Sequence, residues 1–124
     1  MDVRINIDKK FDKDTRRLSG VEMKTLKQKV NLLVDLVRGG LDTSAHLSKL
    51  YSYSFGMDLD SSLYVMKINK TLRLVLTSEE DPLFNEYILT LMRVVKLDDL
   101  DKVFKGIAES LNQQFLNKGG RKNG

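Results

Sequence analysis

The sequence of 124 residues contains no cysteine, no tryptophan, one proline and one histidine. The missing cysteines exclude disulfide bonds, thiolate nucleophiles and cysteine-based zinc sites, and a single histidine excludes a histidine-rich metal centre. We therefore expect no metal and no cofactor. No apolar run approaches the roughly 20 residues that span a bilayer, and the first ten residues lack the apolar core of a signal peptide. These absences predict a cytoplasmic protein that does not contact a membrane.

The charge balance is mildly basic, with 21 Lys and Arg against 17 Asp and Glu, a net charge of +4. This balance permits binding to a polyanion without requiring it. A chain of this length typically forms one compact unit. We expect a single domain over residues 1–118 and a flexible tail over residues 119–124, where the sequence is rich in Gly, Lys and Asn.

Hydrophobic periodicity in the first 40 residues predicts one strand and two helices. Val3, Ile5 and Ile7 alternate with polar residues, as in a half-buried strand, and Asp8 is a suitable N-cap for a short helix over residues 8–18. Residues 22–38 place apolar side chains at steps of three and four and are followed by Gly39 and Gly40, which is typical of an amphipathic helix. We expect the two helices to form a helical hairpin.

The rest of the chain predicts three strands and a last helix. Residues 41–62 show no sustained period and are interpreted as a connecting region, with one helical turn near Leu47 and Leu50. Residues 63–69 and 71–77 form a predicted β-hairpin, the acidic residues 78–86 a solvated loop, and residues 86–96 a central strand that is apolar on both faces. Asp98 or Asp99 would cap the last helix, whose apolar positions are Leu100, Val103, Phe104, Ile107, Leu111 and Phe115.

The predicted fold class is α+β, in the order β-α-α-β-β-β-α. A small, mostly antiparallel sheet would pack against the N-terminal helical hairpin, and a helix would follow at the C-terminal end. The leucines of residues 72, 74 and 76 would cover the helices. The opposite face of the sheet would stay partly open, and a functional site would lie there.

The order and spacing of several segments resemble the RelE/ParE superfamily of toxins from bacterial toxin–antitoxin pairs, particularly its RelE- and HigB-like branches. These segments are IDKKFDKDTRRL after the opening strand, KTLKQKVNLLVDLV, HLSKL, LYVMKINKTLRLVLT, RVVKLDD at the end of the closing strand, and DKVF in the last helix. The resemblance implies a toxin that cuts messenger RNA in the ribosomal A site or, in the ParE branch, inhibits DNA gyrase. It also implies a cognate antitoxin as partner, in a hetero-oligomer, and contact with the ribosome and messenger RNA.

The positions that match the RNA-cleaving site of this superfamily are Lys67, Arg73 and Lys96, and Arg93 adds a further cation to this predicted site on the same final strand as Lys96. Phe104 falls where relatives often have a tyrosine, and Lys96 with Leu97 takes the place of a histidine that many relatives carry. The predicted contacts to RNA phosphates are Lys9, Lys10, Lys13, Arg16 and Lys70.

The implied reaction is attack of a ribose 2′-hydroxyl on the adjacent phosphodiester, which needs proton transfer and cations for the developing charge but no metal. Arg73 suits phosphate binding, whereas Lys67 and Lys96 are candidates for point charges, acid or base. The alternative is a non-catalytic protein of the same fold, such as a gyrase inhibitor or an inactive homologue, that acts by protein contact.

Each candidate also has a purely structural interpretation. Arg73 is equally an ordinary solvated arginine, and Lys67 a lysine whose stem lies along the sheet. Arg93, on the face of Tyr87, Leu89 and Leu91 by strict alternation, would form a buried salt bridge with the acidic loop. The basic residues of the two helices would form i,i+4 ion pairs on a solvated face.

Overall fold

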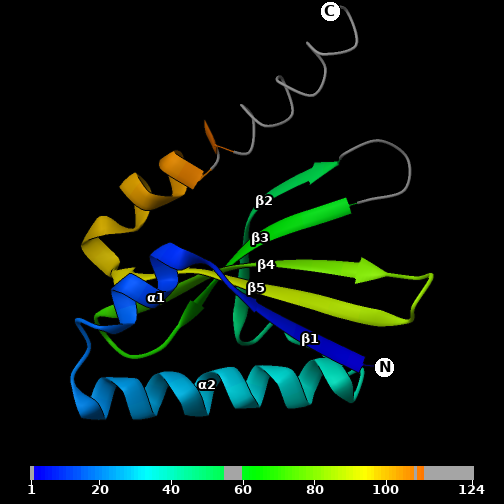
Figure 1. Cartoon of the computed structure of the whole chain (residues 1–124), viewed down its shortest axis with the longest axis horizontal. Coiled ribbons are helices and arrows are strands. Elements are labelled where there is room, and N and C mark those ends of the chain that lie inside the picture. The colour runs from blue at the N-terminus through cyan, green and yellow to red at the C-terminus, as the bar shows by residue number, and fades with distance from the viewer. Residues whose placement is uncertain (1, 55–59, 108, 111–124) are drawn as a thin grey trace, which may run out of the picture.

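The computed structural model describes residues 2–54, 60–107 and 109–110 and has an α+β fold built on one five-stranded mixed sheet (Figure 1). The elements are β1 (Asp2–Ile7), α1 (Lys9–Thr15), α2 (Gly20–Arg38), β2 (Leu47–Ser54), β3 (Asp60–Lys67), β4 (Leu72–Asp81), β5 (Glu86–Lys96) and a 3₁₀ turn (Leu97–Asp99). A C-terminal helical segment follows over residues 100–107.

The strands lie in the order β1-β5-β4-β3-β2. β1 is parallel to β5, and every other neighbouring pair is antiparallel. β5, predicted to be central from its apolar residues on both faces, has a neighbour on each side, which confirms that prediction. The predicted hairpin of β3 and β4 is also confirmed. β1 and β2 are the two edge strands.

The main core lies between α2 and one face of the sheet. Leu26 and Leu33 of α2 are buried with Leu74 and Leu76 of β4 and Leu89 of β5. This confirms that the leucines of β4 cover the helical layer. Figure 1 shows α2 running along the sheet below β1, whereas α1 lies against β5. The prediction of an N-terminal helical hairpin is therefore wrong, because each helix packs on the sheet rather than on the other helix.

The first helix begins at the predicted cap Asp8, whereas the second begins at Gly20, two residues before the predicted start, with a cap at Ser19 that was not predicted. The Asp8 side chain accepts a hydrogen bond from the backbone N–H of Lys10 (2.8 Å) at the start of α1. α2 starts with a capping box, in which Ser19 Oγ accepts from Glu22 N–H and Glu22 Oε1 accepts from Ser19 N–H. Gly40, with φ of +68°, turns the chain just beyond the end of α2, a conformation that glycine adopts without strain.

The prediction of a connecting region over residues 41–62 is wrong, because residues 47–54 form the edge strand β2 and β3 already begins at Asp60. Two features hide this strand in the sequence. Its residues are mostly Ser and Tyr rather than aliphatic, and a β-bulge between Lys49 and Tyr51 interrupts the period of two. Backbone pairing with β3 holds these residues in a strand although their hydrophobic alternation is weak.

The acidic residues 78–86 are not the long loop that we predicted. β4 continues to Asp81 and β5 starts at Glu86, so only residues 82–85 turn. Asp81 Oδ1 accepts hydrogen bonds from the N–H groups of Leu83 and Phe84, and Asn85 adopts a left-handed conformation with φ of 53°. Acidic residues are tolerated in these paired strands because this end of the hairpin is largely exposed to water.

The second face of the sheet is less open than predicted. Val75 lies on this second face, because its neighbours Leu74 and Leu76 point into the main core. Leu63 lies on the same face, because Val75 pairs with Val65, which is two residues from Leu63. Both Leu63 and Val75 are fully buried. Leu111, Phe115 and the predicted tail over residues 119–124 lie outside the described residues. In the described part of the chain, no helix has both the length and the apolar character needed to cross a membrane.

Candidate functional site

Two of the predicted site residues face each other across the β3–β4 hairpin. Lys67 is directly opposite Arg73 in the register, on the face that also carries Val75. Like charges in directly opposed positions repel each other, so this pair weakens the hairpin by a few tenths of a kcal/mol unless an anion lies near it. Lys67 is exposed and Arg73 is half-buried.

The guanidinium of Arg73 is folded back onto the turn that joins β3 and β4. Its Nη1 atom donates to the carbonyl oxygens of Asn69 (2.7 Å) and Leu72 (3.0 Å). Asn69 Oδ1 in turn accepts from the N–H groups of Thr71 and Leu72, both at 2.8 Å. Arg73 therefore stabilises a tight turn, while its Nε and Nη2 make no hydrogen bond to a described residue and keep the two-donor edge that suits a phosphate.

Arg93 lies on a different face of the sheet from the one that strict alternation predicts. β5 has a bulge at Met92, so that Leu91 pairs with Leu76 but Arg93 pairs with Val75. The bulge turns Arg93 away from the main core and onto the face of Lys67 and Arg73. This corrects the expectation that Arg93 shares a face with Leu91.

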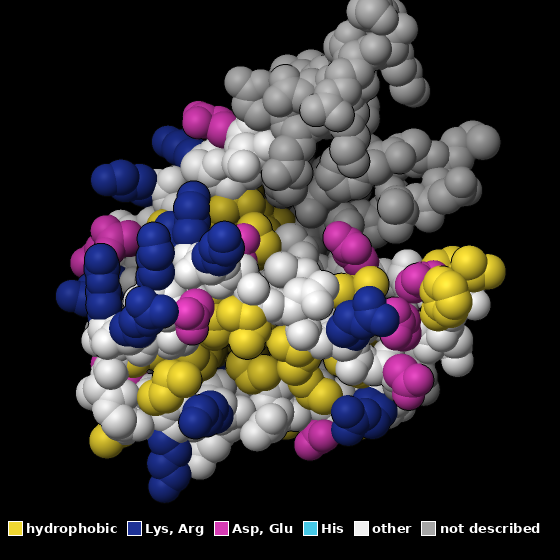
Figure 2. All heavy atoms as spheres, in the orientation of Figure 1, with side chains coloured by type: hydrophobic (Ala, Val, Ile, Leu, Met, Phe, Trp, Pro, Cys, Tyr) yellow, Lys and Arg dark blue, Asp and Glu magenta, His cyan; other side chains and the backbone are white. Residues whose placement is uncertain are grey.

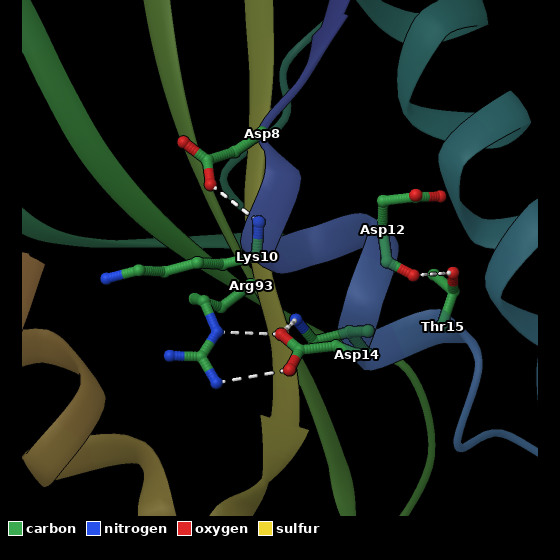
Figure 3. Close-up of polar contacts among 7 residues, drawn as sticks. Asp8, Lys10, Asp12, Asp14, Thr15 and Arg93 are labelled. Atoms are coloured by element: carbon green, nitrogen blue, oxygen red, sulfur yellow. Dashed lines mark hydrogen bonds and ion pairs between the residues drawn. The ribbon is translucent and has the colours of Figure 1, made fainter.

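Arg93 forms a two-point ion pair with Asp14 of α1 (Figure 3). Nε lies 2.7 Å from Asp14 Oδ2 and Nη2 lies 3.1 Å from Oδ1. The same Oδ2 accepts a hydrogen bond from the N–H of Val94 at 3.1 Å. A salt bridge was the structural alternative for Arg93, and it is present, but the partner is Asp14 rather than the acidic loop.

The backbone explains why a carboxylate is needed at this place. β1 ends at Ile7, where Asp8 N–H donates to the Leu91 carbonyl, so the edge of β5 beyond Leu91 has no strand beside it. Asp14 satisfies the Val94 N–H that β1 would otherwise bind, and α1 takes the place of the missing strand. Asp14 is itself largely buried, and its hydrogen bond raises the pKa of Arg93 above its ordinary value, against the opposing effect of burial.

A hollow of about 690 Å³ opens beside this edge, between α1, β5 and the C-terminal helical segment. Figure 3 shows Lys10 and Arg93 extending from α1 and β5 toward that helical segment. The charged residues that line the hollow are Lys10, Arg17, Arg93, Lys96 and Lys102 against Asp14, Glu22 and Asp99. Its volume is within the range of about 300–1,000 Å³ that is usual for ligand sites.

The lining of the hollow has an excess of positive charge, since five cations stand against three carboxylates and the net formal charge is 5 − 3 = +2. Asp14 is already occupied by Arg93. The other four cations form no ion pair with a carboxylate of the described residues. Figure 2 shows several Lys and Arg side chains gathered on this side of the molecule, where α1 lies. The hollow therefore attracts anions.

The structure divides the predicted site residues between two places. Arg93 and Lys96 line the hollow, whereas Lys67 and Arg73 lie at the β3–β4 hairpin and are not part of its described lining. Lys96 pairs with Leu72, two register positions from Val94, and is exposed at the end of β5. The four residues therefore share the region at the end of the sheet without lining a single pocket.

The predicted phosphate contacts are divided in the same way. Lys10 lines the hollow, but the other predicted contacts stand outside its described lining, namely Lys9, Lys13, Arg16 and Lys70. All are exposed, and Arg16 forms the expected i,i+4 ion pair with Asp12, with 3.2 Å between Nη2 and Oδ2. An exposed pair of this kind contributes little to stability and leaves α1 free to meet an anion.

Sequence reasoning missed Asp14 and Lys102 as site residues. Asp14 is one of several acids in a charged helix, and nothing in the sequence distinguishes it from Asp12. Lys102 stands one helical turn before Gly106, which also lines the hollow. Phe104, which occupies the position of a tyrosine in the resembling toxins, is half-buried and is not among the described lining residues.

The fold and the hollow together define an α+β protein with a cation-lined site at an open strand edge. Comparisons of the chain with protein-family models, with curated proteins and with solved structures found no match. The resemblance to the RelE/ParE superfamily therefore depends on the order and spacing of the chain's own segments.

Proposed function

We propose that the chain binds RNA through the cation-lined hollow and acts on messenger RNA at the ribosome, as a toxin of the RelE/ParE type does. The observation that carries this proposal is the set of four cations that line the hollow and form no ion pair with a described carboxylate, namely Lys10, Arg17, Lys96 and Lys102. RNA phosphates are the abundant cytoplasmic anions that such an arrangement would bind by releasing counterions.

The proposed chemistry is attack of a 2′-hydroxyl on the adjacent phosphodiester without a metal. Arginine does not give up its proton in proteins, so proton transfer falls to lysine. Lys96 and Lys102 line the hollow from its two sides, at the end of β5 and in the C-terminal helical segment. In this proposal one of them accepts the proton of the 2′-hydroxyl and the other protonates the leaving 5′-oxygen, so that the O2′–P bond forms as the P–O5′ bond breaks. Arg93, held by Asp14, supplies a fixed positive charge for the developing phosphorane.

The proposal includes a cognate antitoxin that neutralises the protein in the cytoplasm. A protein that covers the hollow would need negative charge to complement its positive lining, and an acidic antitoxin segment meets this requirement. Such a segment would compete directly with RNA for Lys96 and Lys102.

The binding test uses the full chain and a short single-stranded RNA in a fluorescence anisotropy titration at several salt concentrations. Replacing Lys96 and Lys102 with Gln removes two phosphate contacts, so the salt dependence, log Kd against log salt, should lose about 1.4 in slope. Lys24 and Lys27 of α2 do not line the hollow, and the same double replacement there is the matched control. Equal losses in both double variants contradict RNA binding in the hollow.

The second candidate function is RNA or protein binding without cleavage. It is favoured by the engagement of Arg93 with Asp14 and of Arg73 with two carbonyl oxygens, because both guanidinium groups already have partners. Cleavage distinguishes the two functions. An active enzyme leaves a 2′,3′-cyclic phosphate and a 5′-hydroxyl on ribosome-bound message, and a 2′-deoxy nucleotide at the cut position prevents this. Intact RNA that is nevertheless bound in the hollow supports the second function.

A further inference from the structure

The edge strand β1 exposes apolar side chains. Its burial pattern shows five of six residues exposed, including Ile5 and Ile7, whose exposed fractions are 39% and 60%. Figure 2 shows hydrophobic atoms gathered in the middle of the view, where Figure 1 draws β1 above α2. Isoleucines at this exposure in a strand edge are a surface that a partner can bury.

The free backbone groups of β1 follow the same alternation. Asp8 N–H donates to the Leu91 carbonyl at 3.0 Å, and the parallel register with β5 pairs Ile7 with Leu91. In a parallel pair, alternate residues of each strand bond to the neighbour. The backbone groups of Arg4 and Asn6 therefore bond to β5, as the N–H of Asp8 does. The N–H and C=O groups of Val3, Ile5 and Ile7 point outward, and they form no hydrogen bond to another described residue.

This edge lacks three of the devices by which strands usually avoid pairing with another chain. The range Asp2–Ile7 contains no proline, no lysine and no bulge. Its one basic residue, Arg4, forms an ion pair with Glu86, at 3.3 Å, on the face opposite the isoleucines. The edge is therefore open to another strand.

We propose that two copies of the chain associate through β1, antiparallel about a twofold axis at Ile5, and join their sheets into one of ten strands. Val3 of each copy lies opposite Ile7 of the other, and Ile5 lies opposite its own counterpart. This register places the outward groups of Val3, Ile5 and Ile7 opposite one another, so all three residues of both copies find backbone partners. The apolar side chains then line one face of the joint, which buries them.

Charge selects this register from its closest rival. A shift by two residues along the strand would bring Arg4 opposite Arg4 of the second copy, and like charges directly opposite each other are destabilising. In the proposed register Arg4 lies opposite Asn6 instead. A second copy is the occupant that the strand itself supports, because a twofold interface needs one self-complementary patch and the positions 3, 5 and 7 are symmetric about Ile5.

The absence of cysteine from the native chain allows a cross-linking test on single-cysteine variants. In the proposed pairing, Ile5 Cα lies about 5.5 Å from Ile5 Cα of the second copy, within the range of about 4.4–6.8 Å that a disulfide spans. Ile5→Cys should therefore form a covalent dimer on mild oxidation. A mixture of Arg4→Cys and Asn6→Cys chains should cross-link to each other, whereas Arg4→Cys alone should not.

Leu83→Cys is the matched control, because Leu83 is 82% exposed in the turn between β4 and β5 and is not part of β1. Sedimentation of the unmodified chain should show a dimer that dissociates on dilution, and Ile5→Lys should weaken it at least tenfold by placing two charges on the axis. Circular dichroism checks that each variant keeps its fold.

A native chain that stays monomeric at about 1 mM overturns the proposal, as does cross-linking of Leu83→Cys equal to that of Ile5→Cys. Efficient cross-linking of Arg4→Cys alone overturns the register, and a monomer that binds an extended peptide at β1 assigns the edge to another partner.

Discussion

Replacing Asp14 with Ala should lower the free energy of unfolding by about 3 kcal/mol. The substitution removes three hydrogen bonds at once, two from Arg93 and one from the Val94 N–H. Removing one partner of a buried ion pair typically costs about 3–5 kcal/mol, because the other charge stays buried. The Arg93 side chain keeps 27% of its surface exposed, so water recovers part of this cost and the lower end of the range applies.

Urea denaturation followed by circular dichroism measures this loss. With a slope of about 2 kcal/mol/M, the midpoint should fall by about 1.5 M without a change in slope. Asp12→Ala is the matched control on the same helix, since Asp12 and its partner Arg16 are both mostly exposed and such a pair contributes less than about 1 kcal/mol.

A double-mutant cycle separates the ion pair from the rest of the loss. In an Arg93→Met background no guanidinium is left unpaired, so Asp14→Ala should cost clearly less there than in the native chain. The reasoning is refuted if Asp14→Ala costs no more than Asp12→Ala, or if the two substitutions at the ion pair are additive.

Three further predictions concern stability. The hydrogen bond from Asp14 raises the pKa of Arg93 above its ordinary value, so the contribution of Arg93 to stability is lost only at strongly alkaline pH, as the pH rises through the folded-state pKa. This part of the stability should therefore be constant between pH 7 and pH 10 in urea titrations. Ser19→Ala removes the N-cap of α2 and should cost about 1 kcal/mol, measured in the same way. Leu33→Ala opens a cavity at a fully buried position and should cost about 3–4 kcal/mol in urea while RNA affinity of the folded protein stays unchanged.

The elements with strong apolar patterns were predictable from the sequence. β5 and α2 combine long apolar patterns with clear ends, and the structure places them at or near the predicted residues. The strand β2 was not predictable, because Ser and Tyr residues and a bulge hide its alternation. β2 forms because its backbone pairs with β3, and the pattern of side chains within residues 47–54 does not indicate this pairing.

The candidate site was predictable in part. Arg93 and Lys96 were singled out through the resemblance to the RelE/ParE superfamily, and both line the hollow. The partner of Arg93 was not, because Asp14 lies 79 residues away and reaches it only through the bulge in β5 and the docking of α1. The hollow also needs Lys102 of the C-terminal helical segment, and no spacing in the sequence relates that residue to α1.

The most direct test of the central claim is to map where RNA touches the protein. A single-stranded RNA that contains a photoreactive uridine analogue would be cross-linked to the full chain, and the modified peptides identified by mass spectrometry. RNA bound in the hollow predicts cross-links within residues 10–17 and 93–103, which form its walls. Cross-links confined to the exposed face of α2 or to the turn between β4 and β5, with none in those two segments, would contradict the account.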